Sequence, residues 1–414
     1  MLKPILKSLR SGAFCNRRRI VAYSVISFAI ICVSITWLVV QANGNLSPDG
    51  KPLGTDFAQV YVAGLTSHSG DPAQIWDPRT HFDAQDVFFG EDLTAYFAWH
   101  YPPFFLFLAS ALAFLPYLWA LAVWQAASFA GYLMTLRKIT GQLKGWWIPA
   151  VAFPAIYVNL THGHNGFLSA MLIGLGLYFV DKRPWLAGVM IGLMAYKPQF
   201  GLLIPAALLV GQYYRTFAGA GLTVAALSIL STLAYGPEIW PAFTQSLTST
   251  REVFLEQGDT GWFKIQSCFS AVMNLTGNLT LAYILHGLIA FGVLATVVLA
   301  FRSKTAAPED RAALLIIGSL LTTPYLFDYD LIILAPALAF LVTRGLREGF
   351  RPYEVLIISI AWFAPLLTRP LMMYTDIPLG FLSTAALFCV PALAVLQRPL
   401  AGLSGRLARA PEVG

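Results

Sequence analysis

Apolar runs long enough to cross a membrane recur along this 414-residue sequence, and they restrict its fold more than any other feature. A transmembrane helix needs about 20 consecutive apolar residues. The run at 20–40 has 21 residues, and no A-x-A cleavage site of a signal peptide follows it. Charged residues make up only 12% of the chain, whereas a soluble domain carries about 25%. The composition therefore predicts an all-α, polytopic membrane protein and disfavours a soluble globule, a disordered chain and a nucleic-acid binder, despite the net charge of +6.

We expect about twelve transmembrane helices in one membrane domain at 20–396, between a basic N-terminus at 1–19 and a tail at 397–414. The candidate spans are 20–40, 103–136, 146–160, 166–180, 184–196, 199–213, 217–235, 281–301, 312–326, 331–343, 353–368 and 378–396.

Two segments leave the count between ten and fourteen. Segment 103–136 is too long for one upright helix, and Pro116 divides it, so it is either two helices or one broken helix. Segment 267–275 is too short to span, and a re-entrant segment is one interpretation of it.

The distribution of Lys and Arg predicts the orientation. Arg17, Arg18 and Arg19 directly precede the first run. With that end in the cytoplasm, 21 of the 27 basic residues fall inside, and 15 of the 21 acidic residues fall outside. This asymmetry follows the positive-inside rule. We therefore predict a multi-pass protein of the plasma (inner) membrane with both termini cytoplasmic and long non-cytoplasmic loops at 41–102 and 236–266.

The first loop contains the first candidate for chemistry, Gly54-Thr55-Asp56-Phe57. A carboxylate beside apolar residues at a membrane surface has a raised pKa when desolvated, which suits a general base. The alternative is a helix N-cap at Thr55 or Asp56.

The sharpest local signal is Lys197, in the sequence Tyr196-Lys197-Pro198-Gln199 between two short apolar runs. A charge at the centre of a membrane helix costs about 2.5–3.5 kcal/mol. Such a residue is a functional-site candidate that needs a partner, and an anionic phosphate is one. The alternative is a lysine that snorkels to the interface.

Four further outer positions carry polar or aromatic groups in short motifs. Each motif also has a structural interpretation: an interfacial aromatic for Tyr101, a turn for the paired histidines, a helix cap for Asp330 and an interfacial anchor for Trp262. On the predicted topology all six motifs lie on one face of the membrane. The remaining candidates for sugar, acceptor or phosphate binding are Tyr101, His162, His164, Asn165, Gln199, Arg251, Trp262, Lys264, Asp328 and Asp330, with Arg369 as a further cation.

Metal and disulfide signals are weak. His162 and His164 lack a local third ligand, and the four cysteines have no metal-type spacing. The sequence predicts no cofactor and leaves a divalent metal open.

The order of these motifs resembles glycosyltransferase family 87, a family of the GT-C membrane superfamily that contains polyprenol-phosphate-mannose-dependent mannosyltransferases. The resemblance covers roughly 50–335. It rests mainly on Asp56, on Tyr101-Pro102-Pro103 and on Lys197-Pro198-Gln199. The chain differs from the family pattern at His164-Asn165 and at Asp328-Tyr329-Asp330, which leaves the sugar and the acceptor open.

The resemblance implies a GT-C-type enzyme that transfers a hexose, with mannose as the first choice, from a polyprenyl-phosphate-linked donor. It implies transfer to a glycolipid or glycan acceptor on the non-cytoplasmic face, with Asp56 as the general base. We expect direct displacement with inversion, a donor phosphate held by Lys197, with Lys264 and Arg251 behind it, and no need for a general acid.

Two other classes remain as alternatives. Many spans, broken helices and membrane-embedded charges are also typical of a secondary transporter of a polar or lipid-linked substrate. We find no internal repeat, which such transporters usually show. A non-catalytic scaffold subunit for polymer assembly is the third class, and it predicts that substitution of Asp56 is tolerated.

Overall fold

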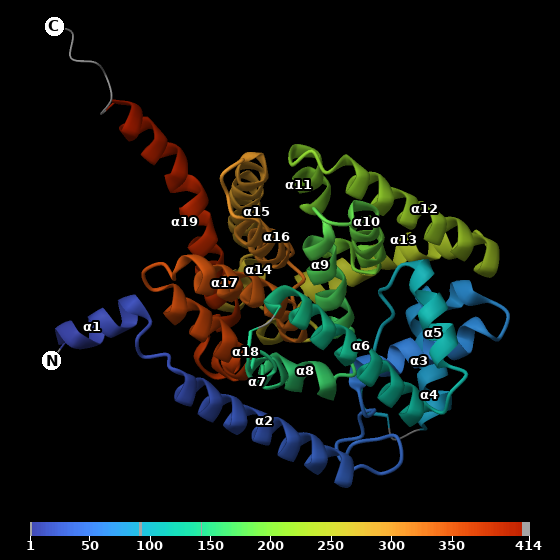
Figure 1. The fold of residues 1–414 in the computed structure, drawn as a ribbon. Helices are drawn as coiled ribbons and strands as arrows, with labels where there is room; N and C mark the ends of the chain where they lie inside the picture. The colour runs from blue at the N-terminus through green and yellow to red at the C-terminus, as the bar shows by residue number, and fades with distance from the viewer. Residues whose placement is uncertain (1, 91–92, 142, 408–414) are drawn as a thin grey trace, which may run out of the picture.

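The computed structural model describes residues 2–90, 93–141 and 143–407, and within these ranges the chain is helical and contains no strand. Figure 1 shows the helices packed into one bundle, with α2 along one edge and α1 extending away from it. The first half contains α1 (Leu2–Ser11), α2 (Arg17–Val40), α3 (Thr55–Ser67), η1 (Pro72–Trp76), α4 (Pro78–Phe89), η2 (Pro103–Phe105), α5 (Leu106–Leu112), α6 (Tyr117–Thr140), α7 (Trp147–Val151), α8 (Ala155–Thr161), α9 (Gly166–Phe179), α10 (Pro184–Leu193), η3 (Met194–Tyr196), η4 (Pro198–Phe200) and α11 (Ile204–Val210).

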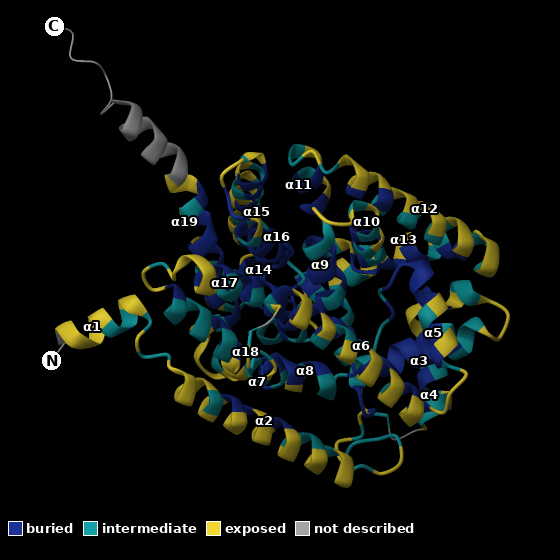
Figure 2. Ribbon diagram, viewed as in Figure 1, coloured by how far each residue is buried: buried dark blue, intermediate teal, exposed yellow. Residues whose placement is uncertain are grey.

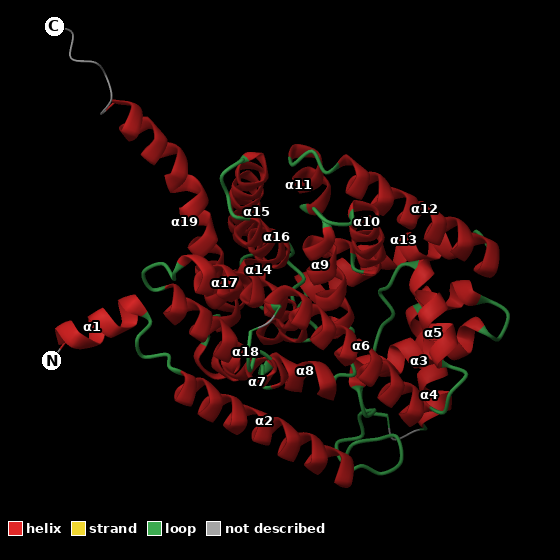
Figure 3. Cartoon of the chain, in the orientation of Figure 1, coloured by secondary structure: helices red, strands yellow, loops and turns green. Residues whose placement is uncertain are grey.

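The second half has the same character (Figure 3). It contains α12 (Tyr214–Tyr235), α13 (Ile239–Thr250), η5 (Arg251–Glu256), η6 (Trp262–Lys264), α14 (Cys268–Thr276), α15 (Leu279–Arg302), α16 (Pro308–Thr322), η7 (Asp328–Ile333), α17 (Leu334–Glu348), α18 (Glu354–Thr375) and α19 (Leu379–Leu407).

The prediction of a polytopic helical membrane protein is confirmed. Among the described residues, six helices are long and apolar enough to cross a membrane, or up to seven when a bent pair counts as one span. The predicted count of twelve also needs shorter apolar segments, and it stays a prediction. The six are Arg17–Val40, Tyr214–Tyr235, Leu279–Arg302, Asp328–Glu348, Glu354–Thr375 and Leu379–Gln397, and the shorter apolar helices are Gly166–Phe179, Pro184–Tyr196 and Pro198–Val210.

The bent pair lies in the segment whose length made the span count uncertain. Pro103–Leu112 and Tyr117–Thr140 meet at 117°, and Pro116 sits in the break between them. Pro116 cannot supply a backbone N–H to continue the preceding helix, so the chain turns there. Segment 267–275 corresponds to the short helix α14, whose first turn Ser267 caps through a hydrogen bond from the Ser270 backbone N–H.

The two segments predicted as outer loops are largely helical. The loop at 41–102 contains α3, η1 and α4, and the loop at 236–266 contains α13, η5 and η6. Asp71 and Asp77 accept hydrogen bonds from backbone N–H groups at the starts of η1 and α4, each just before a proline in the first turn. Such caps satisfy donors that a helix start leaves free. These loops therefore offer rigid elements on which side chains can be positioned.

Large apolar side chains are exposed on several helices of the bundle. Figure 2 shows that exposed positions run along α2, α12 and α15. Val33 and Trp37 on α2 are 69% and 62% exposed, Leu233 on α12 is 78% exposed, and Phe291 on α15 is 72% exposed. Apolar surface of this extent is unfavourable in water and favourable against lipid. This pattern agrees with a bilayer around the bundle.

A buried ion cluster joins α16, α17 and α18 at one end of the bundle. The Arg344 guanidinium, 2% exposed, pairs with Glu354 and lies 3.6 Å from Asp310. Arg351 pairs with the other oxygen of Asp310. Because each buried charge has a partner of opposite sign, removal of one partner would leave an uncompensated charge. The cluster thus fixes the relative register of the three helices.

Candidate functional site

Asp56 lies in the first turn of α3, where two glycines allow the start of this helix to touch the turn between α8 and α9. Gly54, the N-cap, has φ 69°, and Gly163 has φ 59°. A Cβ atom at Gly163 would lie 2.7 Å from the Phe57 Cβ and 3.1 Å from the Gly54 Cα. Only glycine fits such an approach. The Asp56 backbone N–H consequently donates to the His162 carbonyl oxygen at 2.9 Å.

Helix α6 holds both of these segments, although they are far apart in the sequence. The Tyr117 hydroxyl donates to the Leu53 carbonyl at 2.6 Å. The Trp124 indole N–H donates to the Gly163 carbonyl at 3.0 Å, and the Gln125 amide donates to the His164 carbonyl at 3.2 Å. These side chains satisfy buried carbonyls of the turn between α8 and α9, so the turn cannot shift without leaving polar groups unpaired.

The Asp56 carboxylate is the least satisfied acid in this region. No side-chain hydrogen bond caps α3, so Asp56 does not act as the cap that the sequence allowed. Its Oδ2 atom is buried and has no hydrogen-bond partner among the described residues. Desolvation raises the pKa of Asp56; His162 and Lys197 oppose the shift, and Asp328 and Asp330 add to it. A carboxylate of this kind is suited to accept a proton.

Lys197 and Asp330 form a buried ion pair. The Lys197 Nζ lies 2.6 Å from the Asp330 Oδ1, and the two side chains are 5% and 2% exposed. Lys197 follows η3 and precedes Pro198, so the break between η3 and η4 turns its side chain inward instead of continuing the helix. It does not snorkel to the surface. The sequence predicted Lys197 as a ligand of a phosphate, but in the structure its charge is already matched by a carboxylate.

A second pair lies beside Asp56, and it leaves one cation free. The Arg369 Nε, on α18, donates to the Asp328 Oδ2 at 2.6 Å, and a terminal nitrogen of Arg369 lies 3.4 Å from the His162 Nε2. Lys264 makes no ion pair with any residue that the structure describes. Burial lowers the pKa of Lys264, and the Arg369 charge lowers it further, while Asp328 and Asp56 oppose the shift.

The turn between α8 and α9 presents further polar atoms toward the same region. The Asn165 amide N–H donates to the Tyr101 hydroxyl at 2.7 Å. The His164 Nε2 lies 3.4 Å from the Lys197 ammonium, which can only donate, so we assign the proton of His164 to Nδ1. Both the His164 Nδ1 and the Asn165 Oδ1 are buried with no partner among the described residues. Unpaired buried groups of this kind are costly unless a ligand or water completes them.

Tyr329 is a central residue that the sequence analysis passed over. Its ring stacks on His164 with the ring centroids 3.7 Å apart, and it also lies against Phe327, at 5.1 Å. The Lys197 ammonium lies 5.7 Å from the centroid of the same ring. The sequence feature that could have identified Tyr329 is its position between Asp328 and Asp330. An aromatic residue between two buried acids shares their surroundings.

The predicted residues divide into two groups. Tyr101 is 8% exposed and bonded within the bundle, so it is not an interfacial aromatic. Three other candidates are not bonded to this group. Arg251 pairs with Glu256 at 3.3 Å on the surface, the Trp262 indole donates to the Leu255 carbonyl at 3.0 Å, and Gln199 is partly exposed with no side-chain hydrogen bond given among the described residues. The residues that come together are Asp56, Tyr101, His162, His164, Asn165, Lys197, Lys264, Asp328, Asp330 and Arg369.

Metal ligation receives no support from side-chain positions. Within the described parts of the chain, no group of three or more His, Cys, Asp and Glu side chains is placed to hold a metal ion. The described cysteines are all free.

The structure is a helical membrane bundle that brings a buried carboxylate, two ion pairs and Lys264, which forms no ion pair with any described residue, into one region. The model of Glycosyltransferase family 87 matches residues 99–324, which is more than half of the chain. The protein belongs to this family and is a membrane glycosyltransferase. The match includes Tyr101, His164 and Lys197, whereas Asp56 and Asp328 lie outside it. The comparisons with curated proteins and with solved structures found no match.

Proposed function

We propose that this glycosyltransferase moves a hexose, with mannose as the first choice, from a polyprenyl-phosphate-linked donor to a glycolipid or glycan acceptor. The proposal includes a GT-C-type arrangement of about twelve spans in the plasma membrane, with cytoplasmic termini and the reaction on the opposite face. The observation that carries it is the unpartnered, desolvated carboxylate of Asp56 beside a group of cations.

The proposed reaction is a single displacement with inversion. The Asp56 Oδ2 takes the proton of the acceptor hydroxyl as that oxygen forms a bond to the anomeric carbon. The bond between this carbon and the phosphate oxygen breaks, and its electron pair leaves with the polyprenyl phosphate. Because that leaving group is a stable anion, no general acid is required. Fixed cations in a site of low dielectric stabilise the charge that it gains.

Lys264 and Arg369 are the cations that we place on the donor phosphate. Lys264 has no ion pair among the described residues, and Arg369, 33% exposed in its side chain, keeps N–H groups beyond the one on Asp328. Lys197 was the first choice from the sequence, but its pair with Asp330 leaves it less free to bind an anion. We propose that Lys197 neutralises the charge of Asp330. Asp330 then repels the Asp56 carboxylate less than an unpaired acid would.

The decisive assay supplies a labelled prenyl-phosphate hexose and a candidate acceptor to the purified chain in proteoliposomes. Transfer of the label to the acceptor, with inversion at the anomeric carbon, is the expected result. Flux of the donor or the sugar across the vesicle without transfer would instead support the transporter alternative. The lipid-linked species that accumulates when the protein is deleted from its host would name the acceptor.

We expect Lys264→Gln to raise the KM for the donor about tenfold, the effect of losing one charge-assisted hydrogen bond. The kcat should change less, because the acceptor and Asp56 are untouched. Arg79→Gln, which alters an exposed cation of the same outer region, is the matched control. An unchanged donor KM in Lys264→Gln would remove this residue from the phosphate site.

The pH dependence of transfer should follow the ionisation of Asp56. The base must be ionised, and its pKa is raised by desolvation. Activity therefore falls as the pH drops through this raised pKa, at a higher pH than the roughly 3.9 of an ordinary aspartate. Asp328→Asn removes a negative charge near Asp56 and frees Arg369. Both changes should lower the pKa of Asp56, so the loss of activity at acidic pH should occur at a lower pH. Asp83→Asn, at an exposed position, should leave it in place.

A further inference from the structure

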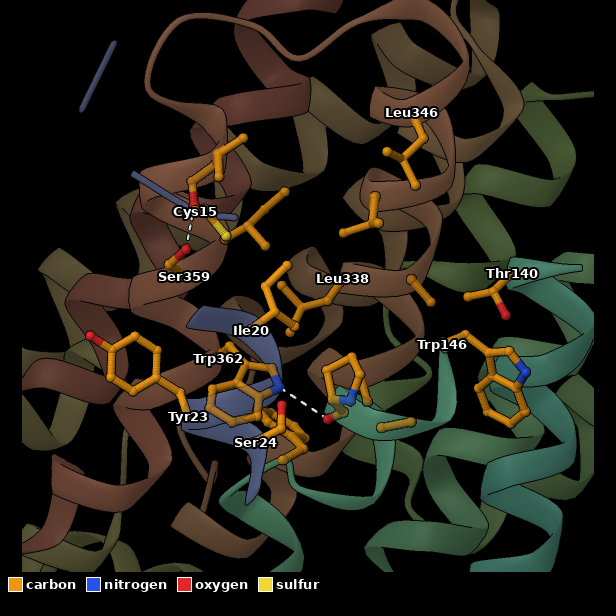
Figure 4. Close-up of a pocket in the computed structure, with 18 of the residues that line it drawn as sticks. Cys15, Ile20, Tyr23, Ser24, Thr140, Trp146, Leu338, Leu346, Ser359 and Trp362 are labelled. Carbon is orange, nitrogen blue, oxygen red and sulfur yellow. Dashed lines mark hydrogen bonds between the residues drawn. The ribbon is translucent and has the colours of Figure 1, made fainter. Parts of the chain in front are cut away.

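An apolar, partly open cavity of about 540 Å³ lies between the N-terminal helices and the rest of the bundle. Figure 4 shows Ile20, Leu338 and Trp362 gathered around it, from α2, α17 and α18. Its volume is within the range of roughly 300–1,000 Å³ that small-molecule sites occupy. The side chains that line it are mainly aliphatic and aromatic, with Arg19 as its one charged residue.

The cavity is distinct from the candidate glycosyl-transfer site, because none of the residues gathered around Asp56 lines it. It follows α17 from Ala335, in the first turn after η7, to Leu346 near the end of the helix. Helix α18 carries Arg369 at the site, whereas Val355 and Trp362 on the same helix line the cavity. On helix α6, Trp124 supports the site, and Thr140 lines the cavity. A substrate that reacts at Asp56 would therefore not react here.

The mouth of the cavity carries uncompensated positive charge. Arg19 donates to the Phe14 carbonyl at 2.7 Å and forms no ion pair with any residue that the structure describes. The short helix α1 is rich in basic residues and also exposes Ile5 and Leu6, at 52% and 51%. A basic helix with exposed apolar side chains is typical of a segment that lies in a membrane interface. The neighbouring basic residues are Lys3, Lys7, Arg10, Arg17 and Arg18.

We propose that this cavity binds one anionic phospholipid from the leaflet next to the N-terminal helices. An acyl chain fills the apolar space between α2 and α17, and Arg19 holds the phosphate of the headgroup. The helix ends near the cavity are those at which basic residues collect, and basic residues beside a membrane attract anionic lipid. Only 11% of the most apolar stretch of α2 is buried in the protein. A lipid bound here would therefore complete the packing of α2 against the bundle.

Native mass spectrometry of the full-length chain, with phosphatidylglycerol or phosphatidylcholine added in equal amounts, tests this proposal. We expect one phosphatidylglycerol per chain to survive detergent exchange, and far less phosphatidylcholine. Arg19→Gln should weaken phosphatidylglycerol binding about fivefold, the effect of one basic residue near an anionic surface. Arg215→Gln removes an exposed cation that, like Arg19 in α2, lies in the first turn of a candidate membrane span, here α12, and it should leave binding unchanged.

A cavity-filling variant distinguishes the contribution of the lipid acyl chain from that of the headgroup. Ala339→Trp places an indole in the cavity and should abolish retention of the lipid, whereas Ala225→Trp, on the exposed surface of α12, should not. Equal retention in Ala339→Trp, or equal binding of both phospholipids, would overturn the proposal. Displacement of phosphatidylglycerol by equimolar polyprenyl phosphate would also overturn it, because the site would then belong to the donor.

Tryptophan fluorescence of the unaltered protein tests the proposal without any substitution that could impair folding. Trp146 and Trp362 line the cavity, and the Trp362 indole donates to the Pro149 carbonyl at 3.2 Å (Figure 4). Brominated phosphatidylglycerol should quench tryptophan emission more than brominated phosphatidylcholine does at the same mole fraction. The excess should shrink in Trp362→Phe. Equal quenching by the two lipids would contradict the proposal whatever the transfer activity of the protein.

Discussion

Asp56→Asn is expected to lower the rate of glycosyl transfer by about 10² to 10⁴ while the protein stays folded and still binds the donor. The substitution keeps the shape of the side chain and removes its ability to take a proton. The buried Oδ2 has no partner among the described residues, so its loss breaks no existing hydrogen bond of the structure. Single-turnover transfer, measured with donor binding on the same sample, separates chemistry from affinity.

The matched control for this experiment is Asp83→Asn, which alters an exposed acid of the same outer region. It should retain wild-type turnover, because Asp83 is exposed on α4 and is not among the residues gathered around Asp56. Wild-type turnover in Asp56→Asn would remove Asp56 from the mechanism. Loss of donor binding in the same variant would point to a structural role and would also contradict the assignment of a base.

Lys197→Met should destabilise the folded protein by about 3–5 kcal/mol, because it leaves Asp330 buried without its counter-ion. The pair is 2.6 Å apart, and both side chains are nearly inaccessible. The temperature at which the detergent-solubilised chain loses its helical circular dichroism measures the change. Lys304→Met, at an exposed position, is the control and should change stability little.

The double variant Lys197→Met, Asp330→Leu tests what the pair does. Replacement of both buried charges by apolar groups is often neutral for stability, so we expect most of the lost stability to return. If Lys197 serves only to balance Asp330, the double variant should also recover a donor KM near the wild-type value. A stable double variant with a donor KM raised tenfold would restore Lys197 as a direct ligand of the phosphate.

Much of the architecture could be predicted from local sequence. The apolar runs predicted helices, and Pro116 predicted the break at which α5 and α6 diverge by 117°. Segment 267–275 proved to be a short capped helix, α14. These outcomes depend on interactions between residues a few positions apart, such as backbone hydrogen bonds, caps and the missing N–H of proline. Local signals allowed a helix start at Thr55 or Asp56, where α3 begins, but they did not reveal α4 and α13.

The partners of the charged residues could not be predicted in this way. The sequence analysis gave Lys197 a phosphate, with Arg251 as a further phosphate-binding cation, and named Trp262 as a ligand of the sugar or the acceptor. In the structure Lys197 pairs with Asp330, 133 positions away, and Arg251 pairs with Glu256 within its own turn. Arg369 and Tyr329, which contact predicted site residues, were given minor or no roles. Side chains so far apart in the chain meet only when the helices have packed.

The chain alone therefore determined that this protein is a helical membrane bundle and that its outer segments carry an unusual set of acids, histidines and lysines. Apolar length and charge asymmetry suffice for that, because a bilayer excludes unpaired backbone and isolated charge. Packing decided which of those charges neutralise one another and which stay available. Two glycines let α3 touch the turn before α9. Among the residues described, this packing leaves the Asp56 Oδ2 atom without a hydrogen bond and Lys264 without an ion pair. Long-range contacts set the local dielectric and the distances between charges, and neither can be read from spacing along the chain.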